Sequence, residues 1–231
     1  MKQIPLDIGL TPRPRLHTLV EGENGRLLTH VREALQQRQP QTVPTYVWGP
    51  GGSGKTHLLQ AVMQELHEQG LSAGWLDAST PCGGYPREFD PRWSAVLLDE
   101  VELYSLEQQH TAFNWFINAM TPQQGEPRWV LAAGSLPVAD LPLREDLRTR
   151  LGWGQVHALQ PLGDEDVRKA LQQGAAERGL ELGDEVVNYM LSRFSRDLGS
   201  LNELLGMLDG YALEQRRALT VPLLKQMLNE T

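Results

Sequence analysis

The sequence contains very little cysteine, no long apolar run and no excess of positive charge. Cys82 is the only cysteine among 231 residues, which excludes an intramolecular disulfide and a zinc site built from several cysteines. The sequence contains no run of about 18 apolar residues, the length that could span a membrane. Its N-terminal residues also lack the apolar core of a signal peptide. The formal net charge of −8 argues against binding nucleic acid through bulk charge. With 40% hydrophobic residues, these absences predict a globular cytoplasmic protein of one large or two modest domains.

One stretch carries a phosphate-binding signature directly after a short apolar run. Residues 46–48 predict a buried strand, and the next eight residues read Gly-x-x-x-x-Gly-Lys-Thr. Glycine permits the tight curl that a phosphate cradle needs, and the helix expected next would point its N-terminal amides at the anion. We expect Lys55 to contact the β- and γ-phosphates and the Thr56 hydroxyl to bind Mg²⁺. The predicted nucleotide-binding residues of this loop are Gly49, Pro50, Gly51, Gly52, Ser53, Gly54, Lys55 and Thr56.

Two other interpretations of these glycines have to be weighed. The loop also fits Gly-x-Gly-x-x-Gly, and Asp77 follows roughly 20 residues later, as in a dinucleotide-binding unit. The third interpretation is an ordinary glycine-rich turn. Neither alternative needs Lys55 and Thr56 in this register after a strand, so the sequence favours a nucleoside triphosphate.

A second chemical signal is an apolar run that ends in two carboxylates. Residues 95–98 are typical of a buried parallel strand, and Asp99 and Glu100 follow directly. Ligands of open α/β sheets lie at the carboxyl ends of the strands, so we expect Asp99 to hold Mg²⁺ directly or through water. Glu100 is placed to orient or deprotonate an attacking water, a catalytic role. Alone, the run could be a strand that meets solvent, but downstream of a phosphate loop it indicates a nucleotide site.

Strands and helices alternate up to about residue 160, and only helices follow. The further strands expected are residues 73–77 and 129–133, and the helices are residues 25–39, 107–120, 164–178, 184–194, 200–215 and 221–229. A loop rich in proline and glycine is expected at residues 80–91. We therefore predict an extended tail at residues 1–14, an α/β domain with a parallel sheet flanked by helices at residues 15–160, and a small all-helical domain at residues 161–231.

The N-terminal tail has the pattern of a docking peptide. Gln3 precedes spaced aliphatic residues, and Pro5 keeps the segment extended. Such a segment suits insertion into an apolar pocket of a partner, with Leu6 and Ile8 as the side chains that enter it. The alternative is that these aliphatic side chains pack onto the chain itself.

Three arginines lie on a short helical segment before Gly152. They are Arg144, Arg148 and Arg150, within residues 143–151. One interpretation is a solvated helix face. The other is that one of them reaches the γ-phosphate of a nucleotide on a neighbouring subunit.

The chain resembles the AAA+ ATPases in the order of its parts. These are the phosphate loop, the strand that ends in Asp-Glu, the arginines before Gly-Trp-Gly and the helical segment. The resemblance is strongest to the initiator DnaA and its shortened relatives, and it covers nearly the whole chain. Residues 147–155 are similar to the arginine-finger segment of that family, and residues 159–162 are similar to the junction between sheet and helical lid.

The resemblance implies functions for these parts. The loop would bind ADP or ATP with Mg²⁺, Asp99 would serve the metal, and Arg150 would be the catalytic finger. The tail is similar to peptides that bind the sliding clamp, the beta subunit of DNA polymerase III, through Gln3, Pro5, Leu6 and Ile8. The implied function is an adaptor that is held on the DNA-loaded clamp and stimulates ATP hydrolysis by DnaA, which limits initiation of replication. DNA would be met only through the clamp, no membrane is involved, and a homodimer is possible.

Two positions depart from the family pattern. The strand at residues 129–133 is followed by Gly134 and Ser135, where the family usually offers a more polar sensor. In the lid, Gly199 or Ser200 stands where a sensor arginine is usual, with Arg196 nearby. We therefore expect little intrinsic ATP hydrolysis. The alternatives are a helicase loader, which has no evident need of a clamp peptide, and an independent P-loop enzyme, which would need a basic lid and an acceptor site.

Overall fold

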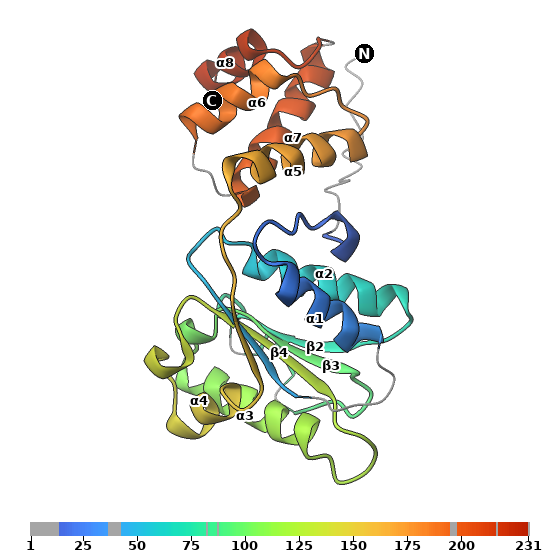
Figure 1. The fold of residues 1–231 in the computed structure, drawn as a ribbon, viewed down its shortest axis with the longest axis vertical. Coiled ribbons are helices and arrows are strands. Elements are labelled where there is room, and N and C mark those ends of the chain that lie inside the picture. The colour runs from blue at the N-terminus through green and yellow to red at the C-terminus, as the bar shows by residue number, and fades with distance from the viewer. Residues whose placement is uncertain are drawn as a thin grey trace. The chain divides into compact units, whose positions relative to one another are not determined.

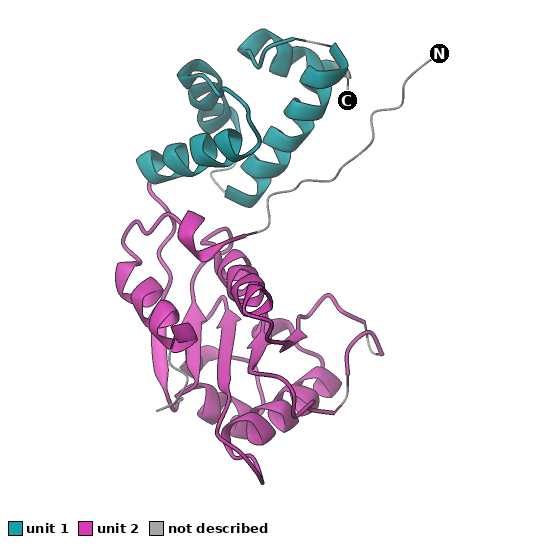
Figure 2. Cartoon of the chain, turned by 90° about the vertical axis from the view of Figure 1, so that its right-hand side faces the viewer, with its two compact units in different colours: residues 1–13, 164–231 teal, residues 14–163 magenta. Residues whose placement is uncertain are grey.

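The computed structural model describes residues 14–36, 43–81, 83–86, 88–194, 198–215 and 217–230. The chain divides into two compact units, one made by residues 14–163 and one by the helices from Asp164 onward (Figure 2). Each unit buries apolar side chains of its own. The catalytic and nucleotide-binding residues predicted above all lie in the first unit.

Five parallel strands form the sheet of the first unit, in the order β2-β3-β4-β1-β5. They are β1 (Thr45–Trp48), β2 (Ala73–Leu76), β3 (Ala95–Leu98), β4 (Trp129–Gly134) and β5 (Gln155–Ala158). Trp48, the last residue of β1, is level with Gly134 of β4 and Ala158 of β5. Leu98, the last residue of β3, is level with Ala132 of β4. The carboxyl ends of β1, β3 and β4 therefore meet at one edge of the sheet, where ligands bind in folds of this kind.

Helices cover both faces of this sheet, which explains why its central strands are apolar without alternation (Figure 1). The helical elements of the unit are η1 (Leu16–Thr18), α1 (Gly25–Gln36), α2 (Lys55–Glu68), η2 (Val101–Leu103), α3 (Leu106–Met120), η3 (Val138–Asp140) and α4 (Glu145–Leu151). On one face, η1, α1 and α2 pack with Val47 and Leu97. On the other, α3 and α4 pack with Tyr46 and Val96. The phosphate-loop helix and the arginine-bearing helix thus lie on opposite faces.

Local sequence accounts for where the long helices begin. Ser105 accepts a hydrogen bond from the Gln108 backbone N–H, and the Gln108 side chain accepts from the Ser105 backbone N–H. This reciprocal capping box fixes the start of α3 at Leu106.

The predicted loop at residues 80–91 contains no helix or strand in its described residues.

β5 is a strand that the apolar-run criterion does not find. Its residues Gln155–Ala158 are mostly exposed, and within the described chain the strand pairs with β1 alone. The Gln155 N–H donates to the Pro44 carbonyl at 2.9 Å, and the Leu159 N–H donates to the Trp48 carbonyl at 2.7 Å. An edge strand buries little apolar surface, so its sequence carries only a weak signal.

The second unit contains only helices in its described residues, as predicted. They are α5 (Asp164–Glu177), α6 (Asp184–Arg193), α7 (Leu198–Gln215) and α8 (Val221–Glu230). Leu171, Val187, Leu205 and Leu224 are fully buried among them. No helix in the described part of the chain is long and apolar enough to cross a membrane.

Candidate functional site

The loop between β1 and α2 is shaped by glycines that no other residue could replace easily. Gly52 and Gly54 have φ values of 75° and 97°, in the left-handed region that favours glycine. At Gly49, an added Cβ atom would collide with the backbone carbonyl oxygen of Leu159. The Gly49 N–H also donates to the Gly134 carbonyl at 3.2 Å. The loop is therefore fixed against the ends of β4 and β5 at its first residue.

The loop presents unsatisfied donors at the start of α2. Gly54 is the N-cap of this helix, and no side chain of the described residues caps it. The Ser53 hydroxyl is buried and has no hydrogen-bond partner within the described structure. Free amides at a helix N-terminus, the positive end of the helix dipole and an orphaned hydroxyl all favour an anion. These residues therefore fit a phosphate group.

Lys55 holds its ammonium group over the same loop. Its Nζ donates to the carbonyl oxygens of Gly49 at 2.8 Å and Pro50 at 2.9 Å. Burial lowers the pKa of Lys55, and the negative charges of Glu102, Asp99 and Glu100 oppose that shift. An ammonium has three donors, so two loop carbonyls leave one for a phosphate oxygen.

Asp99 lies at the end of β3, only 2% exposed, where it meets the first turn of α2. Its carboxylate accepts hydrogen bonds from the Thr56 hydroxyl and from the Glu100 N–H, the latter at 3.0 Å. Burial raises the pKa of Asp99, although both hydrogen bonds and the charge of Lys55 favour the ionised form. Thr56 and Asp99 thus offer two adjacent oxygen ligands, the donor type that Mg²⁺ prefers.

Glu100 has an unusual backbone beside this pair. Its φ of 51° and ψ of 43° make it the one non-glycine residue with positive φ in the described chain. Burial and the charges of Asp99 and Glu102 raise its pKa. Strain of this kind is found at functional sites, where the surrounding structure holds a side chain in place. The geometry is compatible with the role predicted for Glu100 toward a water molecule.

Glu102 is a residue of this site that the sequence interpretation missed. Its Oε1 accepts the Ser135 N–H at 3.0 Å, and its Oε2 is buried without a partner in the described structure. A Cβ atom on Gly134 would lie 2.8 Å from that Oε2. Glu102 therefore ties the end of β4, where a sensor residue was expected at Ser135, to the turn after β3. No local motif marks this role.

Asp77 is explained by its own turn. Its carboxylate accepts hydrogen bonds from the Trp75 indole at 2.8 Å, the Ser79 hydroxyl at 2.6 Å, and the backbone and side chain of Thr80 at 2.8 and 3.0 Å. These bonds lower its pKa against the opposing effect of burial. A ribose-binding role is not needed to account for this residue.

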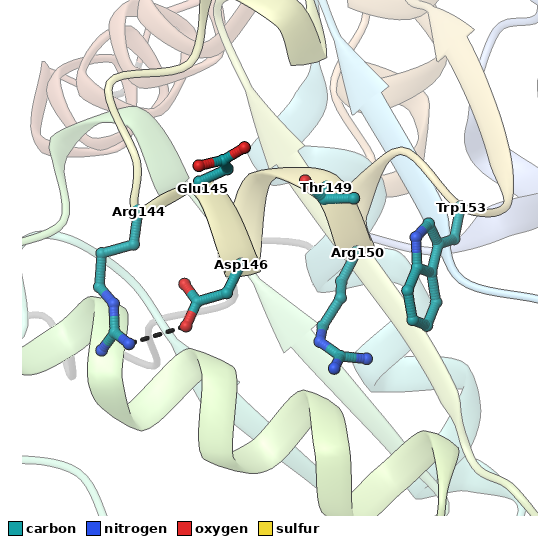
Figure 3. A pocket seen from close by; sticks show the side chains of 6 residues that line it. All are labelled: Arg144, Glu145, Asp146, Thr149, Arg150 and Trp153. Carbon is teal, nitrogen blue, oxygen red and sulfur yellow. Dashed lines mark hydrogen bonds and ion pairs between the residues drawn. The ribbon is translucent and has the colours of Figure 1, made fainter.

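The arginines of α4 differ in their surroundings, and Figure 3 shows the pocket of about 620 Å³ that two of them line. Arg144 is paired with Asp146 at 2.7 Å. Arg150 has no carboxylate partner among the described residues, and its guanidinium lies over the rings of Phe113 and Trp153. Arg148 does not line this pocket. The pocket is formed by Arg144, Glu145, Asp146, Thr149, Arg150 and Trp153.

Comparison with known families decides the relationship. Residues 10–73 match the family described as the bacterial DnaA ATPase domain, and residues 164–228 match the family described as the Hda lid domain. This chain is a DnaA-related AAA+ protein. The two matched segments contain the phosphate loop and nearly all of the second, helical unit.

Solved structures support the AAA+ fold of this DnaA-related chain. Domain III of the Thermotoga maritima replication initiation protein DnaA covers 95% of the chain and 97% of its own length, with a TM-score of 0.74 and 18% identity. The match with AMPPCP-bound DnaA from Aquifex aeolicus covers 87% of this chain and 66% of that protein, with a TM-score of 0.66 and 22% identity. The match with the Thermotoga maritima RuvB Holliday junction branch migration motor covers 94% of this chain and 71% of that protein, with a TM-score of 0.66 and 13% identity. At these identities the likeness establishes the fold, a parallel sheet flanked by helices.

Some residues predicted to have a function lie outside the described residues of this AAA+ chain. They are the tail residues Gln3, Pro5, Leu6 and Ile8, and Arg196 near the lid sensor position. The structure brings the phosphate loop, Asp99 and Glu100 together at one edge of the sheet. It places Arg150 on the opposite face from α2.

Proposed function

We propose that this chain acts like Hda proteins, as a regulatory inactivator of DnaA that stimulates hydrolysis of DnaA-bound ATP and so limits initiation of DNA replication. The observation that carries the proposal is a lid of the Hda type at residues 164–228, on the same chain as a DnaA-type ATPase segment. A lid specific to this group separates the chain from P-loop enzymes in general.

The chain's own nucleotide is proposed to be ADP or ATP with Mg²⁺. Residues 49–56 would hold the phosphates, and Thr56 and Asp99 would bind the metal, in keeping with the orphaned Ser53 hydroxyl and the uncapped start of α2. The phosphates of the bound nucleotide would accept hydrogen bonds from these donors and would place a negative charge beside the ammonium of Lys55. DnaA bound to AMPPCP among the similar structures also supports a nucleotide here. We propose that intrinsic hydrolysis is weak, because the sensor position after β4 carries only Ser135, whose backbone N–H donates to Glu102.

Arg150 is proposed to act on the nucleotide of DnaA. It lies with α4 on the sheet face opposite α2, so its guanidinium is directed away from the chain's own phosphate loop. Arginine suits the role because it stays charged and its planar fork matches phosphate oxygens. An arginine finger stabilises charge in the transition state of phosphoryl transfer and contributes on the order of 10³–10⁵ in rate.

The remaining partners follow from the tail. Residues 3–8 would dock in the sliding clamp, which would place the chain near DnaA on DNA without a DNA-binding surface of its own. A second copy of the chain is a further proposed partner. No membrane contact is proposed.

A reconstituted assay with clamp, primed DNA and ATP-bound DnaA tests this function. Arg150→Ala is expected to abolish stimulated hydrolysis while ADP binding and clamp binding stay intact. Arg148→Ala, two residues away on the same helix, is the matched control and should have the smaller effect. Full stimulation by Arg150→Ala, or no stimulation by the parent chain, would contradict the proposal.

A further inference from the structure

The guanidinium of Arg150 lies over two aromatic rings. Its Cζ atom lies 4.6 Å from the centroid of the Trp153 ring and 5.3 Å from that of the Phe113 ring. Both distances are within the range of cation–π attraction. Figure 3 shows the Arg150 and Trp153 side chains next to each other on one side of the pocket.

The carboxylate of Asp146, which lines the same pocket, is paired with Arg144 and not with Arg150. Arg144, whose guanidinium lies 5.7 Å from the Phe113 ring, takes up Asp146 in an ion pair of 2.7 Å. Arg150 has no ion pair or hydrogen bond of its side chain within the described structure. An aromatic face attracts the charge but does not use the N–H donors. The fork of Arg150 is therefore held in place and remains able to bind an anion.

The two glycines on either side of Trp153 fix the turn that carries it. A Cβ atom on Gly152 would lie 3.2 Å from Val138 Cγ1, and one on Gly154 would collide with the Pro44 carbonyl oxygen. The Trp153 N–H donates to the Arg150 carbonyl at 3.1 Å. The sequence Gly-Trp-Gly thus lets the backbone pass close to η3 and β1 while the indole stays over Arg150.

The exposure of Trp153 is unusual for so large an apolar side chain. It is 61% exposed, so burial in the core of this chain does not explain a tryptophan here. Among aromatic side chains, tryptophan gives the strongest attraction for a cation.

We propose that Trp153 is a positioning residue, whose indole holds Arg150 in the orientation that meets the γ-phosphate on DnaA. This inference rests on the function proposed above. Holding the guanidinium before the partner arrives removes the cost of ordering a long side chain in the transition state. Trp153 therefore affects the maximal rate of stimulated hydrolysis and has little effect on how tightly the chain and DnaA associate.

The test uses the full chain with clamp, primed DNA and ATP-bound DnaA, and varies the ring alone. Trp153→Leu keeps an apolar side chain without a π face, and Trp153→Phe keeps a π face. Trp153→Leu should lower the maximal stimulated rate roughly 2- to 5-fold, the range of a cation–π contact at an exposed site. Trp153→Phe should recover most of that loss. The concentration of chain that gives half-maximal stimulation should be unchanged in both variants.

A spectroscopic measurement reports the same contact without DnaA. The Nε–H signal of Arg150, assigned by its absence in Arg150→Lys, should carry a ring-current shift that Trp153→Leu reduces to the contribution of Phe113 and Trp153→Phe largely retains. Tyr189→Ala is the matched control, because it removes a ring 5.9 Å from Arg193 in the helical unit. It should leave both the stimulated rate and the Arg150 signal as in the parent.

Three results would overturn the inference. They are equal maximal rates for Trp153→Leu and the parent, a raised half-maximal concentration with an unchanged maximal rate, and an Arg150 signal that does not depend on residue 153. If Arg150→Ala still stimulates DnaA, the function proposed for Arg150 fails instead. If Arg150→Ala is inactive and Trp153→Leu is fully active, only the role of Trp153 fails.

Discussion

At the scale of single residues, the phosphate site is defined by charges that oppose one another. Lys55 lies near Asp99, Glu100 and Glu102, and burial shifts the pKa of Lys55 downward and those of Asp99 and Glu100 upward. Burial thus disfavours the charged form of each of these three groups. A phosphate and a divalent cation would give these charges partners, so ligand binding and stability should be coupled here.

The first prediction concerns Lys55. Lys55→Ala removes a charge-assisted hydrogen bond to phosphate, a contact of roughly 1.5–3 kcal/mol, so affinity for ADP should fall about tenfold or more. Isothermal titration calorimetry with Mg²⁺ and ADP measures this. Lys169→Ala is the control, because Lys169 is exposed and, among the described residues, forms an ion pair only with Asp166, at 3.8 Å in the helical unit. Equal affinity in Lys55→Ala and the parent would rule out the assigned role.

The second prediction separates binding from stability at Asp99. The folded pKa of Asp99 is raised, so the folded state holds the proton more tightly than the unfolded state. Its ionisation therefore lowers stability as pH rises from the unfolded value of about 3.9 through the folded pKa. Without ligand at neutral pH, Asp99→Asn should be at least as stable as the parent.

Addition of Mg²⁺ and ADP should reverse that order. The amide of Asp99→Asn is a poorer ligand for Mg²⁺ than a carboxylate, so the rise in melting temperature on adding ligand should be much smaller than in the parent. Thermal melts at pH 4.5 and pH 7, with and without ligand, measure both effects. A variant that is less stable without ligand at pH 7, yet shows the parent's full ligand-induced rise, would contradict the prediction.

At the scale of elements, the sequence predicts those parts whose chemistry is local. The phosphate loop follows from its glycines with Lys55, and β3 follows from a buried apolar run that ends at Asp99. β5 could not be found, because Gln155–Ala158 is exposed and becomes a strand only by pairing with β1. The role of Glu102 and the stacking of Trp153 on Arg150 depend on tertiary contacts that no residue spacing encodes.

The third prediction tests the junction that holds β5. An added Cβ atom at position 154 would collide with the Pro44 carbonyl oxygen, which accepts the Gln155 N–H at the start of the pairing. Gly154→Ala should therefore reduce the free energy of unfolding by about 1–3 kcal/mol or more, the range of overpacking. Gly25→Ala is the control, since its nearest neighbour is Glu21 Oε2 at 3.6 Å, and it should change stability by less than about 0.5 kcal/mol. Urea unfolding measures both variants, and equal midpoints would contradict the steric argument.

At the scale of the whole molecule, the chain distributes its tasks over separate parts. Helix α2, which follows the phosphate loop, and helix α4, which carries Arg150, lie on opposite faces of one sheet in the unit of residues 14–163. The Hda-type lid forms a unit of its own. The proposed nucleotide site and the outward-directed Arg150 can therefore be altered independently. The proposed tethering function belongs to a third part, the tail, which lies outside the described residues.

The last prediction tests that the tail alone carries affinity for the sliding clamp. Deletion of residues 1–10 should abolish clamp binding and leave ADP affinity unchanged, because the phosphate loop lies in the folded unit. Within the tail, Leu6→Ala removes a side chain whose burial is worth roughly 1.5–3 kcal/mol, so clamp affinity should fall about 10- to 150-fold. Leu10→Ala lies beyond the Gln3 to Ile8 motif and should bind as the parent does. Surface plasmon resonance on immobilised clamp measures these affinities, and a synthetic peptide of residues 1–10 should compete with the full chain. A tail-deleted chain that still binds clamp, together with a peptide that does not compete, would place the clamp-binding surface on the folded units.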